Sequence, residues 1–141
     1  MAEPAVKQGP RARPQYTNIQ ISQILQYRLP LAGVVSILHR ISGALMFLFG
    51  LPFILYLFQQ SITSEISFES YKAIVASPLA KLVLLGFIWA YLHHFCAGIR
   101  YLLLDLDVGT EKEQSKTSAA VVLAVSLALT AIIALKLFGA F

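Results

Sequence analysis

Long apolar stretches, separated by short polar segments, make up the chain from about residue 29 onward. Each stretch is free of acidic and basic residues over close to the ~20 residues that a helix needs to cross about 30 Å of hydrocarbon. The charge-free windows are residues 41–64, 82–99 and 117–135. This pattern predicts an all-α membrane protein with three transmembrane helices, over residues 29–60, 78–106 and 117–141.

Polar segments precede and join these helices: residues 1–28 form an N-terminal arm, and residues 61–77 and 107–116 form two connections. The first 18 residues contain three prolines but no apolar run, so we expect neither a cleavable signal peptide nor a typical transit peptide. Pro52 lies inside the first helix and lacks a backbone donor, which predicts a kink there. The second helix can continue past Arg100, because a long basic side chain extends toward the interface.

Composition and charge place the protein in a bilayer and give it an orientation. Only 13% of its residues are charged and 57% are hydrophobic, whereas about 25% of a soluble domain is charged. Much of the net charge of +4 comes from the arm, which carries Lys7, Arg11, Arg13 and Arg28. By the positive-inside rule, the arm and the second connection face the cytoplasm and the first connection faces the periplasm. The basic residues are not interleaved with aromatics, so no nucleic-acid partner is expected.

Small residues form a stripe along the third expected helix. Such a stripe lets helices approach closely, so we expect it to be the packing face of a structural helix. The helix contains no polar group beyond serine and threonine, which argues against an ion pathway through it. The residues of the stripe are Ala120, Ala124, Ala128, Ala131 and Ala134.

Two adjacent histidines, His93 and His94, lie near the end of the second charge-free window. An ionisable ring at membrane depth is costly and is by default a functional hypothesis. His94 shares a helix face with Gly98, Tyr101 and Asp105, whereas His93 is rotated about 100° away. A flat macrocycle could stand on the His94 face, with iron at the imidazole, its ring over Gly98 and its propionates near Tyr101. The alternative is a histidine that hydrogen-bonds a neighbouring helix and binds no cofactor.

A second polar cluster opens the first apolar stretch. Ser36, His39, Arg40 and Gly43 follow one another at helical spacing, so they share a face. A hydroxyl, an imidazole and a guanidinium could hydrogen-bond a quinone carbonyl or hold haem propionates, because arginine is a fixed multi-donor cation suited to carboxylates. The alternative is an interfacial arginine that anchors the helix to phospholipid.

Both clusters resemble signatures of one family. Residues 36–43, SILHRISG, resemble S-x-x-H-R-x-[ST]-G, and residues 94–105, HFCAGIRYLLLD, resemble H-x-x-x-G-[IV]-R-[HY]-L-x-x-D. These signatures are those of the cytochrome b large membrane-anchor subunit of succinate dehydrogenase, respiratory complex II. They occur in the family's order, on the first and second of three helices, and the resemblance covers the chain from Tyr27 onward.

The resemblance implies a role for each matching residue. His94 takes the place of an axial ligand of haem b iron, and a small three-helix anchor subunit packed against this chain supplies the second histidine. Ser36 and Arg40 match positions that face ubiquinone, while His39 and Arg40 match positions near the haem propionates. Tyr101 stands where many members have histidine, and its phenol can donate one hydrogen bond to a propionate.

The resemblance also implies partners and a place of action. A flavoprotein subunit with FAD oxidises succinate, an iron–sulfur subunit relays electrons, and the two anchor subunits present ubiquinone at the cytoplasmic surface. Asp105 matches an acidic position there, with a structural or proton-supplying role. This chain has no flavin fold or iron–sulfur cysteine set, so it is not expected to oxidise succinate alone.

Two further alternatives stay open at this point, and they concern direction and cofactor. The chain could anchor a fumarate reductase, since the direction of catalysis depends on redox potentials. It could also be a haem-free structural anchor whose histidines pair between helices. The lack of an evident transit peptide favours a bacterial inner membrane over a mitochondrial one.

Overall fold

The computed structural model describes residues 20–139, and the regular elements in that range are helices. Three helical segments are long and apolar enough to cross a membrane: Leu31–Thr63, Pro78–Asp105 and Lys112–Leu137. The all-α class and the presence of three membrane-spanning helices, both predicted from the sequence, are therefore confirmed. The expected N-terminal arm lies largely outside the described residues, and its described part contains the short helix α1 (Ile21–Gln26).

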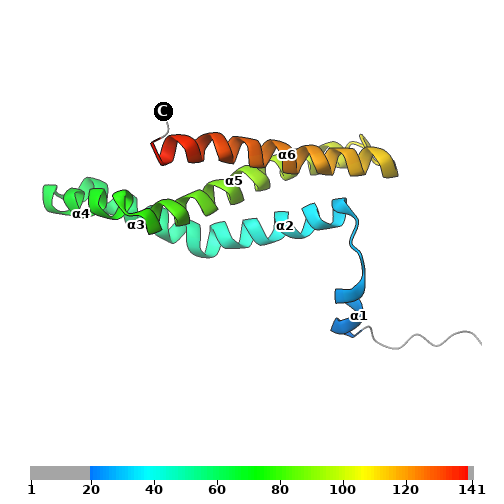
Figure 1. Ribbon diagram of the computed structural model, residues 1–141, viewed down its shortest axis with the longest axis horizontal. Coiled ribbons are helices and arrows are strands. Elements are labelled where there is room, and N and C mark those ends of the chain that lie inside the picture. The colour runs from blue at the N-terminus through cyan, green and yellow to red at the C-terminus, as the bar shows by residue number, and fades with distance from the viewer. Residues whose placement is uncertain (1–19, 140–141) are drawn as a thin grey trace, which may run out of the picture.

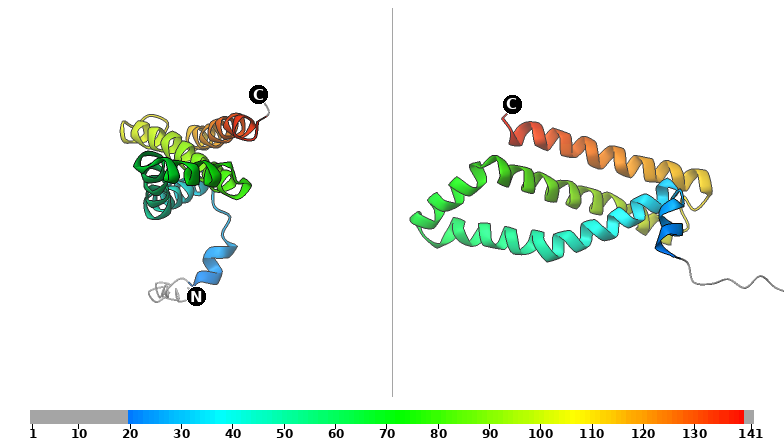
Figure 2. Two further views of the ribbon diagram at one scale, coloured as in Figure 1. Left: turned by 90° about the vertical axis from the view of Figure 1, so that its left-hand side faces the viewer. Right: turned by 60° about the horizontal axis from the view of Figure 1, so that its bottom comes forward.

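The three spans alternate in direction along one long axis (Figures 1 and 2). The second span, α5 (Pro78–Asp105), packs against both α2 (Leu31–Leu45) of the first span and the third span, α6 (Lys112–Leu137). The turn between α5 and α6 and the short helix α1 lie at one end of the bundle, and α4 (Glu65–Ala76) lies at the other (Figure 2, right view). The start of the first span and the end of the second are therefore neighbours.

The first span is continuous but irregular. It consists of α2, a π-helical turn η1 (Met46–Gly50) and α3 (Leu51–Thr63). The wide turn comes directly before Pro52, where a kink was predicted, and the Leu51 amide donates to the Met46 carbonyl across it. At 1.5 Å per residue the span is about 50 Å long, which exceeds the ~30 Å hydrocarbon thickness and requires tilting or projection beyond it.

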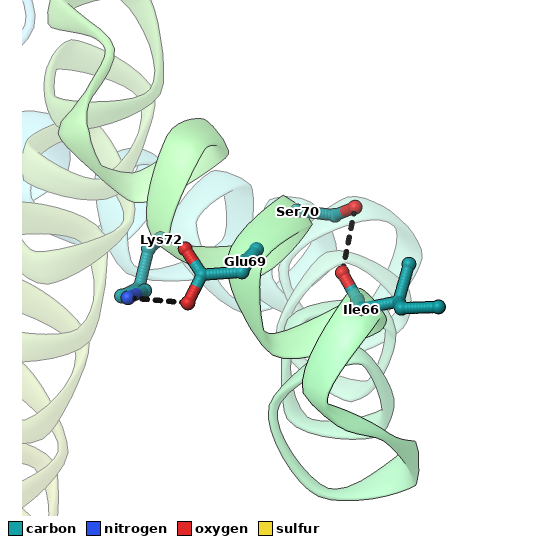
Figure 3. Close-up of polar contacts among 4 residues, drawn as sticks. All are labelled: Ile66, Glu69, Ser70 and Lys72. Atoms are coloured by element: carbon teal, nitrogen blue, oxygen red, sulfur yellow. Dashed lines mark hydrogen bonds and ion pairs between the residues drawn. The ribbon is translucent and has the colours of Figure 1, made fainter.

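The first connection forms a helix of its own, α4. It begins with a capping box, in which the Ser64 hydroxyl accepts from the Ser67 amide and the Ser67 hydroxyl accepts from the Ser64 amide. Lys72 pairs with Glu69 at 2.6 Å on its exposed surface (Figure 3). This ordered connection joins α3 directly to α5.

The second connection is a tight turn fixed by the end of α5. The Val108 amide donates to the Leu103 carbonyl and the Asp107 amide to the Leu104 carbonyl, each at 3.0 Å. These two bonds form a Schellman motif, whose residue in the left-handed region is here Asp107, with φ of 59°. The turn sets α6 antiparallel to α5 at close range.

The core lies where all three spans meet, around Val35, Ala97, Ala119 and Val122. The buried face of α6 comprises Ala119, Val122 and Ser126, so the alanine stripe is not the face that packs within this chain, and its packing role stays a prediction. Of that stripe only Ala134 is partly covered, and the other four alanines are exposed. The physical reason is that α6 turns its serine-bearing face toward α5, where Ser115 and Ser118 bind a buried arginine, Arg100.

Candidate functional site

The two motif segments meet where α2 packs against α5. The Nδ1 atom of His94 lies 3.0 Å from the backbone carbonyl oxygen of His39. A carbonyl only accepts, so Nδ1 carries the proton and donates it to this bond. In the neutral ring the other nitrogen, Nε2, then has a free lone pair. This is the arrangement by which a protein fixes the tautomer and orientation of a metal-binding histidine.

Ser42 reinforces this contact. Its side chain is buried, and its hydroxyl donates to the His39 carbonyl at 2.9 Å while lying 3.3 Å from His94 Nδ1. The hydroxyl and the imidazole therefore converge on one acceptor. Sequence reasoning assigned Ser42 no role, although it fills the [ST] position of the first signature and lies one turn after His39.

Gly43 makes room for the His94 ring. A Cβ atom at this position would lie 2.8 Å from Cε1 and 3.2 Å from Nδ1 of His94. The first distance is shorter than van der Waals contact, so a larger residue would displace the imidazole or push α2 away from α5. The glycine of the first signature is therefore part of the site, because its lack of a side chain leaves room for the imidazole.

The His39 side chain covers the neighbouring part of α5. Its ring stacks on the His94 ring, with centroids 4.0 Å apart and planes 14° apart, and contacts the Tyr101 ring at 5.1 Å. A Cβ at Gly98 would meet His39 Nε2 at 3.8 Å. The space over Gly98, where a macrocycle was expected to pass, is therefore taken by His39. The helical period placed Gly98 on the correct face but could not tell which side chain of α2 would lie against it.

An apolar groove of about 640 Å³ begins at His94 and runs between the first and second spans toward α4. Gly43 and Gly50 form part of its floor, and the only imidazole in its lining is that of His94. A second close fit occurs here, because a Cβ at Gly50 would lie 3.1 Å from the Phe87 ring. Apolar side chains therefore surround the His94 ring on the side that faces the groove.

Ser36 lies one turn before Arg40 on α2, and Arg40 directly follows His39 in the sequence. Arg40 is exposed and Ser36 is half-buried. The only ion pair found among residues 20–139 joins Lys72 to Glu69, so no described carboxylate neutralises Arg40. Its guanidinium is available for an external anion or carbonyl.

Asp105 is exposed and ends α5. Eleven residues of helix separate it from His94, which corresponds to about 16 Å. The structure therefore keeps Asp105 apart from the His39–His94 contact, directly before the turn between α5 and α6.

The adjacent histidine, His93, faces the interior of the bundle. It is 0% exposed, and neither ring nitrogen has a hydrogen-bond partner within the described part of the chain. Its ring stacks on Trp89 with centroids 5.4 Å apart. Arg100, two turns along the same face, is 5% exposed and binds α6. The helix continues past Arg100 as expected, but α6 covers the guanidinium and supplies hydroxyl acceptors for it.

Together these features define a three-span membrane protein with an imidazole whose free nitrogen borders an apolar groove, and with an arginine next to His39 that forms no ion pair among residues 20–139. The chain belongs to the family described as the succinate dehydrogenase/fumarate reductase transmembrane subunit, which its sequence matches over residues 12–133. The family recognised from the two signatures is thus confirmed.

Two relatives agree with this assignment. The chain is 34% identical over 129 residues to the succinate dehydrogenase cytochrome b556 subunit of Paracoccus denitrificans, covering 92% of this chain and 94% of the relative. It is 32% identical over 104 residues to the subunit of the same name from Coxiella burnetii, covering 73% of this chain and 82% of the relative. Both relatives are subunits of an oxidoreductase complex by name.

Proposed function

We propose that this chain is the membrane-anchor and electron-transfer subunit of a succinate:ubiquinone oxidoreductase and holds haem b together with a second anchor subunit. The observation that carries the proposal is the bond from His94 Nδ1 to the His39 carbonyl, which leaves Nε2 free to coordinate. The relatives' names support it, since both are cytochrome b556 subunits of succinate dehydrogenase. These names also favour the succinate-oxidising direction over fumarate reduction.

The residues around His94 fit a shared haem. His94 would supply one ligand to the haem iron, and a histidine of the small anchor subunit would supply the second. The bound haem would supply a one-electron relay. The apolar groove that begins at His94 suits the apolar part of a porphyrin. Arg40, which has no ion-pair partner in the described part of the chain, and the adjacent His39 suit its propionates.

Tyr101 fits a propionate less directly. Its hydroxyl oxygen is buried and has no hydrogen-bond partner among the described residues. A buried unpaired hydroxyl is costly, so an acceptor supplied on assembly would satisfy it. The Tyr101 ring also supports His39 through their ring contact.

Ser36 and Arg40 would bind the ubiquinone head group. Quinone reduction adds two electrons and two protons, so the site needs hydrogen-bond donors at the carbonyls and positive charge nearby. The Ser36 hydroxyl and the unpaired Arg40 guanidinium supply these. The flavoprotein subunit with FAD and the iron–sulfur subunit would deliver the electrons.

The location would be a bacterial inner membrane with the N-terminus in the cytoplasm. Asp105, at the cytoplasmic end of α5, would contribute structure or protons there.

The haem assignment is tested by placing leucine at each of the two histidines in the purified complex. His94→Leu should abolish the low-spin bis-histidine absorbance, because leucine cannot coordinate iron. His93→Leu is the matched control and should keep that absorbance in full. An unchanged reduced-minus-oxidised spectrum in His94→Leu would refute the ligand assignment, whereas a wild-type complex without haem absorbance would favour a haem-free anchor.

The quinone assignment needs two assays on the same preparation. Arg40→Ala and Ser36→Ala should slow ubiquinone reduction, by up to the ~10²-fold seen when a charge-stabilising donor is lost. Succinate oxidation by an artificial acceptor that bypasses the membrane should be unchanged. Arg28→Ala removes another exposed arginine near the same helix and serves as the control. Equal losses in both assays would count against a quinone role.

A further inference from the structure

Arg100 is a buried cation whose hydrogen bonds are all to neutral groups. Its Nε donates to the Ser118 hydroxyl at 2.9 Å, and its Nη2 donates to the Ser115 hydroxyl at 2.8 Å and to the Ser115 carbonyl at 3.2 Å. The residue is 5% exposed. These contacts hold the guanidinium between α5 and α6 and supply oxygen acceptors, but no negative charge.

A buried charge without a counter-ion is unfavourable, because hydrogen bonds to neutral groups replace only part of its lost hydration. Among residues 20–139 the only ion pair is that of Lys72 with Glu69, at the far end of the bundle. Within the described residues the Nη1 atom of Arg100 donates no hydrogen bond, and it keeps some accessible surface. The guanidinium therefore keeps donors for an anion from outside the chain.

A cavity of about 320 Å³ lies beside this guanidinium. Arg100 and Ser118 provide polar groups in its wall, while the side chains of Ile99, Leu103 and Val121 provide much of its apolar surface. These three apolar residues are also 46%, 46% and 53% exposed, so they lie on the outer surface of two membrane-spanning helices. The cavity thus opens at the outer surface of these two helices and has the charged group in its wall.

The depth of the site matches a lipid head group. Arg100 lies five residues before the end of α5, which corresponds to about 8 Å along the helix axis. Val108 and Gly109 of the turn between α5 and α6 close the cavity on the side of that end. A group bound here would have its polar part near the turn and its apolar part along the spans.

We propose that this cavity binds the phosphodiester of a membrane phospholipid. The phosphate oxygens would accept from the Arg100 guanidinium, which suits phosphate through its planar set of donors. One acyl chain would continue over the apolar wall formed by Ile99 and Val121. The bound lipid would supply the missing negative charge and fix α6 against α5.

The charged residues around the cavity indicate which part of the lipid is recognised. The end of α5, the turn and the start of α6 carry the acidic Asp105, Asp107, Glu111 and Glu113 and the basic Lys112 and Lys116, all of them exposed. This mixture does not form a basic surface that would select lipids by net charge. Recognition therefore depends on the phosphate itself, and both zwitterionic phosphatidylethanolamine and anionic phosphatidylglycerol should bind.

The first test counts phospholipids that stay bound when the membrane complex containing this chain is purified in mild detergent and examined by native mass spectrometry. Arg100→Gln should retain one phospholipid fewer than the wild type. Lys116→Gln, which removes an exposed cation from the same end of α6, should retain the wild-type number. Equal retention in Arg100→Gln would overturn the proposal and point instead to a carboxylate of a partner subunit.

A second variant keeps the proposal testable if Arg100→Gln does not fold. Val121→Phe leaves Arg100 intact but fills the lipid-facing side of the cavity, so it too should lose one phospholipid.

Add-back to the delipidated wild-type complex separates the possible sources of the anion. Phosphatidylethanolamine or phosphatidylglycerol vesicles should raise Tm, whereas inorganic phosphate and diacylglycerol should not. An equal rise with inorganic phosphate would show a simple anion site, and an equal rise with diacylglycerol would show apolar filling alone. Either result would overturn the proposal.

Discussion

The adjacent histidines of α5 have opposite surroundings. His94 donates from Nδ1 to the His39 carbonyl, borders the apolar groove and has Gly43 in front of its ring. His93 is completely buried beside Trp89, and both of its ring nitrogens lack partners among the described residues. A step of one residue rotates a side chain by about 100° around the helix, so His94 borders the groove while His93 faces the interior of the bundle.

The same division continues toward the end of the helix. Arg100, on the side of His93, binds the serines of α6, while Tyr101, on the side of His94, contacts the His39 ring of α2. Residue type therefore does not identify a ligand. What distinguishes His94 is a fixed partner for one ring nitrogen and space in front of the other.

The strongest test of this distinction is Gly43→Ala. The added methyl group would lie 2.8 Å from Cε1 of His94, so the imidazole must move or the helices must separate. We expect most of the haem to be lost, with a destabilisation of about 1–3 kcal/mol from overpacking. Haem content per purified complex and the thermal unfolding midpoint measure the two effects.

Gly86→Ala is the matched control for this substitution. Gly86 also lies in a membrane-spanning helix, but a Cβ there has no other side chain within 4 Å. Alanine should keep the haem and stabilise the helix by up to about 1 kcal/mol. If Gly43→Ala retained haem as well as Gly86→Ala, the space in front of His94 would have no role in binding.

Ser42→Ala should have a smaller effect. It removes the hydroxyl that shares the His39 carbonyl with His94 but leaves the ligand in place. Loss of such a supporting contact typically weakens metal binding about 10–100-fold. The rate of haem transfer to an apoprotein acceptor should rise accordingly. Ser126→Ala removes an equally buried serine with a similar bond to its own helix and should leave that rate unchanged.

The sequence predicted the spans well because charge-free windows of membrane length allow few other structures. The two signatures also identified both segments that meet at the site. Periodicity could not predict which neighbouring helix each face would contact. For that reason the role of Ser42, the His39 ring over Gly98 and the burial of Arg100 were found only in the structure.

A third prediction concerns stability rather than cofactor binding. His93→Leu replaces a buried ring with two unpaired nitrogens by an apolar side chain of comparable size. Removing unsatisfied polar groups should leave stability unchanged or raise it by about 1 kcal/mol. The unfolding midpoint in detergent measures this change. A large destabilisation would show that His93 has a polar partner, either the neighbouring Val35 backbone or a group from outside the described residues.

The smallest effect is expected for Gly98→Ala, which tests where the macrocycle lies. A Cβ at this position would meet His39 Nε2 at 3.8 Å, which is ordinary van der Waals contact. We therefore expect full haem content, an unchanged spectrum and a stability change within about 1 kcal/mol. The sequence pattern alone had placed the porphyrin over Gly98, and in that arrangement a methyl group would press directly on the macrocycle. A shifted haem spectrum or lost haem in Gly98→Ala would therefore mean that His39 moves aside on assembly and that the macrocycle takes its place.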